Sequence, residues 1–134
     1  MKPLWVLDTN IVVSALLTPE GACAALFEHM RMGRFAMAWT PAIAREYSEV
    51  LQRPKFGWGQ SLAANFLAQL PVDALVSPAP APELPDRDDE PFLAAALATP
   101  DRVLVTGNIK DYPPARRAGV KIITAREALE LLAG

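Results

Sequence analysis

The sequence predicts an α/β domain built around a mainly parallel sheet, and three observations support this fold class. Short, wholly apolar runs recur along the chain, and each is long enough for a strand buried on both faces. Amphipathic stretches of helical periodicity separate these runs, as they do in repeated strand–helix units. The length of 134 residues is typical of one compact domain, so we expect residues 1–134 to form a single domain.

The N-terminal half is expected to contain two strands and four helices. Residues 4–7 (LWVL) form the first apolar run and residues 37–39 (MAW) the second. Thr40 is a suitable cap for a helix whose first position is Pro41, and Pro54 ends that helix. The other helices, marked by apolar residues at helical spacing, are expected over residues 10–17, 22–32 and 60–70.

The C-terminal half continues the alternation after a proline-rich connector that is too short to separate two domains. Thr124 and Glu127 have the spacing of a capping box, which predicts a final helix with Gly134 beyond its end. The remaining elements expected in this half are strands at residues 72–78, 102–106 and 120–124 and a helix at 91–98.

Composition and charge restrict the class of protein. The net charge of −2 and the pI near 5.4 argue against general electrostatic binding of nucleic acid, for which a domain pI above roughly 9 is usual. They leave room for nucleic acid held by a local basic patch and a metal. Cys23 is the only cysteine, so no internal disulfide forms, and its place on an apolar helical face predicts a core residue. We recognise neither a signal peptide nor a membrane-spanning run, and therefore expect a cytoplasmic protein without a membrane partner.

Acidic side chains gather where the expected strands and helices meet one edge of the sheet. Asp8 directly follows the first apolar run, and Asn108 and Asp111 follow the run at 102–106. Ligands of open parallel sheets bind outside the carboxyl ends of the strands. A cluster of acids opens the helix before that later strand, and Glu46 borders the buried face of the helix after the second strand. The cluster comprises Asp86, Asp88, Asp89 and Glu90.

Carboxylates crowded at one edge take up protons or bind a cation. Because no cysteine or histidine accompanies them, the oxygen-only set selects Mg²⁺ or Mn²⁺ over zinc. Such an ion orients a water and neutralises phosphate charge, which suits hydrolysis of a phosphodiester. Structural roles compete: Asp8 also suits a helix cap, Asp89 a favourable charge at a helix N-terminus and Glu46 a surface position. We favour the site for these three residues, and caps or a solvated turn for Asp86, Asp88 and Glu90.

Four stretches in order, LDTNIVVSALL, REYSEVLQRPKF, DRDDEPFLAAALA and LVTGNIKDYP, resemble the PIN-domain nucleases over nearly the whole chain. The likeness is to the branch of VapC-like toxins of toxin–antitoxin pairs. It implies a three-layer α/β/α sandwich around a parallel sheet and a ribonuclease that cleaves RNA with Mg²⁺ or Mn²⁺. It further implies an antitoxin protein as a partner and a homodimer.

By position, Asp8, Glu46 and Asp89 match the first, second and third acids of the family. Asn108 stands where many relatives have a fourth acid, and Asp111 follows three residues later. Under this hypothesis Asp8, Asp89 and an oxygen of Asn108 or Asp111 hold the metal, directly or through water. Glu46 orients or deprotonates the attacking water. We expect Asp111 to contribute through water, with Asn108 beside it.

Other residues are expected to support this site or to bind RNA. Asn10 is expected to hold the first acid or a metal-bound water, and Trp58 is expected to pack or to stack on a base. The supporting polar residues are Thr9, Asn10, Ser14 and Thr106. The candidates for contacting the RNA backbone, each equally suited to a solvated surface charge, are Arg53, Lys55, Lys110, Arg116 and Arg117.

Two other functions fit parts of the pattern. A haloacid-dehalogenase-like phosphatase also has an Asp after its first strand, but it needs a second acid two residues on, where this chain has Asn10. A PIN module without catalytic activity, which binds RNA or a protein partner, would explain Asn108 in place of an acid. A phosphate-binding loop is not supported, because TGNIKD lacks the glycine spacing of either common motif.

Overall fold

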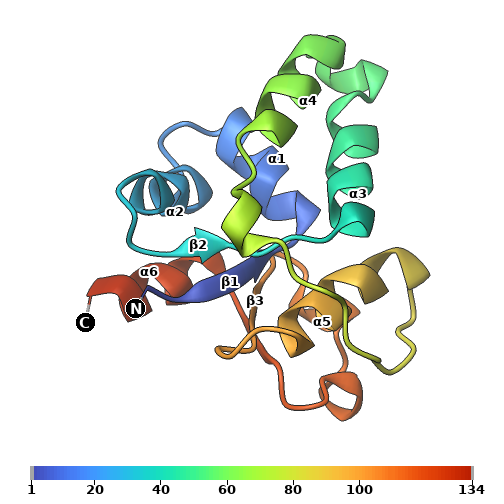
Figure 1. Cartoon of the computed structure of the whole chain (residues 1–134). Coiled ribbons are helices and arrows are strands. Elements are labelled where there is room, and N and C mark those ends of the chain that lie inside the picture. The colour runs from blue at the N-terminus through green and yellow to red at the C-terminus, as the bar shows by residue number, and fades with distance from the viewer. Residues whose placement is uncertain (1, 134) are drawn as a thin grey trace.

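The computed structural model describes residues 2–133, which form an α/β sandwich around a four-stranded parallel sheet of order β2-β1-β3-β4. The pairs β2–β1, β1–β3 and β3–β4 are all parallel. Helices lie on both sides of the strands (Figure 1), so the predicted fold class is confirmed. The strands are β1 (Leu4–Leu7), β2 (Ala36–Met37), β3 (Val103–Val105) and β4 (Lys121–Ile123).

The six helices follow the predicted positions with small shifts at their ends. Thr40 Oγ1 accepts from the backbone N–H of Ile43 (3.2 Å) and Pro41 begins the helix, as expected. Thr124 and Glu127 exchange the two hydrogen bonds of a capping box (3.0 and 3.1 Å). Gly134 lies outside the described residues. The helices are α1 (Thr9–Leu17), α2 (Ala22–Arg31), α3 (Pro41–Leu51), α4 (Gly59–Ala68), α5 (Glu90–Leu97) and α6 (Ala125–Ala133).

The strand expected at residues 72–78 does not form. Val72–Ala74 is a 3-10 turn, and Leu75 makes only one parallel bridge, with Trp39. The backbone N–H groups of Ala74 and Leu75 donate back to Pro71 and Val72 within the turn (3.1 and 3.3 Å). These two N–H groups are therefore not available for hydrogen bonds to a neighbouring strand. The chain pairs with the segment after β2 at one residue pair, Trp39 and Leu75.

The core lies between the sheet and the helices that cover it. Val6 and Leu7 of β1 and Leu104 and Val105 of β3 are fully buried, as expected for strands covered on both faces. Cys23 is half-buried and packs against this core. Within residues 2–133 no single helix is long and apolar enough to cross a membrane. Helices α1 and α2 together have the length and composition of a membrane span, but the pair is bent by 100°.

Candidate active site

Asp8 lies at the carboxyl end of the central strand β1, where it is both buried and a helix cap. Its backbone N–H donates to the carbonyl of Val105 (2.9 Å), which extends the pairing with β3 by one step. Its Oδ1 accepts from the backbone N–H of Thr9 (2.8 Å), at the start of α1. Only 4% of Asp8 is exposed. The cap uses one carboxylate oxygen, so capping and a role in a site are compatible.

Two hydroxyl groups from the C-terminal part of the chain hold the second oxygen of Asp8. The Thr106 hydroxyl donates to Oδ2 (2.9 Å), and so does the Tyr112 hydroxyl (3.0 Å). Burial raises the pKa of Asp8, the hydrogen bonds from Thr106, Tyr112 and Thr9 partly oppose that rise, and the charge of Asp111 adds to it. The hydrogen bonds thus fix the orientation of the carboxylate, while burial still disfavours its ionised form.

Asn10 holds the loop that follows β3. Its Oδ1 accepts from the backbone N–H of Gly107 (2.8 Å), and its Nδ2 donates to Thr106 Oγ1 (3.3 Å). We expected Asn10 to hold the first acid or a metal-bound water; among residues 2–133 it makes no direct bond to Asp8 and instead acts on it through Thr106. A Cβ at Gly107 would lie 3.2 Å from Asn10 Oδ1, so glycine permits this close approach.

Asp89 contributes a carboxylate oxygen that is buried and unsatisfied. It ends the 3-10 turn Arg87–Asp89 at the start of α5, and its Oδ2 is buried without a hydrogen-bond partner. Burial is the largest cause that raises the pKa of Asp89 from 3.8 to about 7, followed by the charges of Asp8 and Asp111. The three acids are therefore near enough to one another to compete for ionisation.

Glu46 approaches the same acids from α3. The side chain is half-buried, and burial is the main cause that raises its pKa above the ordinary value. The negative charge of Asp88 raises it further, whereas Arg53 partly opposes the rise. A carboxylate whose pKa is raised in this way is a better proton acceptor than an ordinary one.

The acids from β1, α3 and the turn before α5 line one cavity of about 370 Å³, which we call the acid cavity. Three predicted supporting residues, one of them the exposed Ser14, reach it from α1. Asp86 and Asp88 also line it, although Asp86 Oδ1 accepts from the Asp88 N–H (2.9 Å) in the capping role that we favoured. The polar and charged lining comprises Asp8, Thr9, Asn10, Ser14, Glu46, Arg53, Lys55, Asp86, Asp88 and Asp89.

The two candidates for a fourth ligand lie beside this cavity and are not part of its lining. Asn108 is exposed, and its backbone N–H donates to Thr106 Oγ1 (3.0 Å). Asp111 is half-buried, at the end of the 3-10 turn Ile109–Asp111, and its charge raises the pKa of both Asp8 and Asp89. Of the two, Asp111 is the one that interacts electrostatically with the other acids.

The oxygen atoms around the acid cavity fit a divalent cation that keeps much of its water. Within residues 2–133 no three carboxylate, histidine or cysteine side chains are close enough to bind one ion together. Mg²⁺ is usually bound by one or two carboxylates and retains several waters. Asp89 Oδ2 and Thr9 Oγ1 are buried polar atoms without hydrogen-bond partners. A cation with its waters would supply partners for these two atoms and would neutralise the negative charge of the neighbouring carboxylates.

The five basic candidates separate into two groups. Arg53 and Lys55 are exposed and line the acid cavity, whereas the other three do not. The Arg116 guanidinium donates to the carbonyl of Glu83 (2.9 Å), and Arg117 Nε donates to the carbonyl of Tyr112 (2.8 Å). These two arginines hold loops in place, and Lys110 is an exposed charge on the turn after β3.

Sequence reasoning missed the two buried tyrosines next to Asp8. Tyr112 donates to Asp8 itself, and the Tyr47 hydroxyl donates to the carbonyl of Leu7 (2.5 Å), the residue before Asp8. Tyr47 is fully buried on α3, but the apolar pattern of a buried helix face does not show a hydroxyl contact. Tyr112 had no local signal, since its partner lies 104 positions away.

Comparison with known proteins identifies the protein family of this chain. No curated protein and no solved structure gives a significant match to the chain. A family model described as "PIN domain" matches residues 5–110, which include Asp8, Glu46 and Asp89. PIN domains are generally nucleases and typically use divalent metals. The chain belongs to the PIN-domain family.

Proposed function

We propose that this protein is a metal-dependent endoribonuclease that hydrolyses phosphodiester bonds of single-stranded or structured RNA. One observation carries the proposal: Asp8, Glu46 and Asp89 come from separate parts of the chain and line one cavity, in which Asp89 Oδ2 is buried without a partner. Family membership supports a nuclease, and PIN nucleases typically bind RNA.

Asp8 and Asp89 are the residues that would hold Mg²⁺ or Mn²⁺, with Asp111 acting through water and Asn108 beside it. When bound, the ion supplies positive charge that neutralises the phosphate and lowers the pKa of water. Thr106 and Tyr112 keep the Asp8 carboxylate in one orientation through their hydrogen bonds to Oδ2. Positioning of this kind limits the reorganisation needed when substrate and ion arrive.

Glu46 is the proposed general base. It accepts a proton from the attacking water, whose oxygen then forms a bond to phosphorus while the bond from phosphorus to the 3′-oxygen breaks. The 3′-oxygen takes up a proton from solvent, which leaves a 3′-hydroxyl and a 5′-phosphate. The raised pKa of Glu46, caused mainly by burial, favours proton acceptance.

Cleavage assays with Mg²⁺, with Mn²⁺ and with EDTA test the proposal. We expect metal-dependent RNA cleavage that is lost in Asp8→Asn and Asp89→Asn, while Glu46→Gln lowers kcat by about 10²- to 10⁴-fold. Asp73→Asn is the matched control, because Asp73 is an exposed acid outside the acid cavity. Circular dichroism should show that each variant is folded, and retained cleavage in Asp8→Asn would contradict the assignment.

The same assays separate the two competing functions. Hydrolysis of small phosphate esters, without cleavage of RNA, would indicate a phosphatase. Calorimetry that detects no Mn²⁺ binding, together with RNA binding but no cleavage, would indicate a PIN module without catalytic activity.

We further infer that the enzyme is the VapC-like toxin of a toxin–antitoxin pair, acts in the cytoplasm, forms a homodimer and is neutralised by an antitoxin protein. The four stretches that resemble toxins of this branch support this role. Induced expression in a bacterium should stop growth for the native sequence and not for Asp8→Asn. Normal growth with the native protein present and active in vitro would exclude the toxin role and leave the ribonuclease assignment intact.

A further inference from the structure

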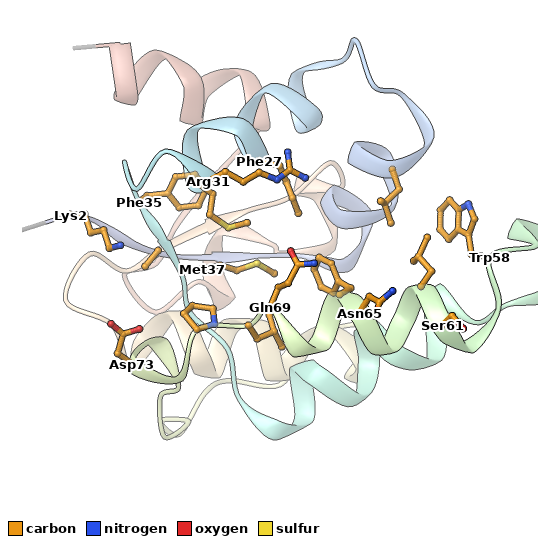
Figure 2. A pocket seen from close by; sticks show the side chains of 17 residues that line it. Lys2, Phe27, Arg31, Phe35, Met37, Trp58, Ser61, Asn65, Gln69 and Asp73 are labelled. Carbon is orange, nitrogen blue, oxygen red and sulfur yellow. The ribbon is translucent and has the colours of Figure 1, made fainter.

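A stacked aromatic pair joins the acid cavity to a second hollow. Phe56 lines the acid cavity, and Trp58 lines a groove of about 660 Å³ formed by α2, β2 and α4. The two rings are stacked, with centroids 4.5 Å apart and planes 12° from parallel. Figure 2 shows Trp58 at one end of the groove, beyond Ser61 and Asn65 of α4. The pair therefore extends from the acids towards this groove.

Positive charges accompany the two rings. Arg53 and Lys55 are exposed and line the acid cavity, and the Lys55 ammonium lies 5.2 Å from the centre of the Phe56 ring. Six consecutive residues, 53–58, thus supply two cations and two aromatic rings beside the acids. Proteins hold single-stranded nucleic acid with this combination, because cations follow the phosphates and aromatic rings stack on bases.

Local backbone hydrogen bonds hold the segment that carries the two rings in shape. Pro54 begins a 3-10 turn in which the Phe56 N–H donates to the Arg53 carbonyl and the Gly57 N–H to that of Pro54 (both 3.1 Å). Gly57 then adopts φ 68°, a left-handed conformation that side chains disfavour. The turn brings the rings of residues 56 and 58 together before any ligand binds, and such preorganisation lowers the cost of binding.

We propose that the Phe56–Trp58 pair is a base-binding subsite, on which an unpaired nucleobase next to the cleaved bond stacks while Arg53 and Lys55 hold the flanking phosphates. This rests on the proposed function, since the acids of the same cavity are taken to cleave the RNA. The subsite requires an unpaired nucleotide at that position. Paired RNA offers no free base face, so a duplex of the same sequence binds without this contact.

The test measures binding in EDTA, so that no cleavage occurs, with three fluorescent RNAs of one length. One is single-stranded, one has abasic residues at its centre, and one is the matching duplex. Stacking is worth about 1–3 kcal/mol per base, so Trp58→Ala should weaken binding of the single strand by about 5- to 100-fold. It should leave the abasic RNA and the duplex unchanged. Trp58→Phe should retain most of the affinity, and Leu75→Ala, an exposed apolar residue outside both hollows, is the control.

Arg53→Gln and Lys55→Gln together should weaken all three RNAs and reduce the salt dependence of binding. Equal losses on base-containing and abasic RNA in Trp58→Ala, or no loss on either, would overturn the subsite. A parallel cleavage assay with Mn²⁺ distinguishes the two proposals. Cleavage with an unchanged KM in Trp58→Ala refutes only the subsite, whereas base-dependent binding by a native protein that cleaves no RNA refutes only the proposed function.

Discussion

Replacing Asp89 with asparagine removes a charge from the acid cavity and preserves the shape of the side chain. In the native protein Asp89 Oδ2 is buried without a partner, and burial together with nearby acids raises the pKa of Asp89 from 3.8 to about 7. The ionised carboxylate therefore destabilises the metal-free fold at neutral pH. We expect Asp89→Asn to increase the stability of the metal-free protein while it abolishes RNA cleavage, as is common when catalytic groups are strained.

The size and sign of the effect follow from that pKa. The folded state holds the proton of Asp89 more tightly than the unfolded chain, so this stability is fully present below pH 3.8 and is lost as the pH rises to about 7. About three pH units at about 1.4 kcal/mol each set an upper limit of about 4 kcal/mol. Because Asp89 is only partly buried, solvent screening reduces this, and we expect a gain of about 2 kcal/mol at pH 8.

Urea unfolding in EDTA between pH 4 and pH 8 measures this effect. The difference in free energy of unfolding between Asp89→Asn and the native protein should be small near pH 4 and should grow towards pH 8. Asp73→Asn, an exposed acid outside the acid cavity, should show no such trend. A difference that is independent of pH, or a variant less stable than the native protein at pH 8, would refute the reasoning.

Three other variants or conditions test separate parts of the structure. Tyr112→Phe removes a hydroxyl that donates to the buried Asp8, so urea unfolding at pH 7 should show a loss of about 1–3 kcal/mol; an unchanged stability would mean that this bond is not made in solution. Mg²⁺ at 100 times its Kd should raise the stability of the native protein by about 2.7 kcal/mol and that of Asp89→Asn by much less, which thermal unfolding can compare. Thr124→Ala removes half of the capping box of α6 and should lower the free energy of unfolding by about 1 kcal/mol, with cleavage unaffected.

The sequence predicted those parts of the fold that depend on neighbouring residues. The helix starts at Thr40 and Thr124 were correct because a cap is a bond between a side chain and a backbone group three positions away. The strand predicted at residues 4–7 was correct, and the one predicted at 102–106 forms over 103–105, because a run buried on both faces is apolar throughout. Residues 72–78 (VDALVSP) are apolar only in part, and the local turn uses the N–H groups that a strand needs.

The candidate site was predictable in outline because the carboxyl ends of parallel strands share one edge. That rule placed Asp8 and Asp89 near each other. Both residues line the acid cavity, and the charge of Asp8 raises the pKa of Asp89. The rule does not predict the path of the loop that follows β3. The positions of Tyr112 and Asp111, and the use of Arg117 to hold the Tyr112 carbonyl, depend on the path of that loop.

The hydrogen bonds to Asp8 also determine when the site can exist during synthesis of the chain. Asp8 leaves the ribosome 98 and 104 positions before Thr106 and Tyr112, whose hydroxyls hold its Oδ2. The neighbouring strand β3, at Val103–Val105, is made equally late. Contacts between such distant positions form slowly and only after the intervening chain is present. The acid cavity is therefore completed only after residue 112 has been made, and a nascent chain that ends before β3 contains Asp8 without the hydroxyls that hold it.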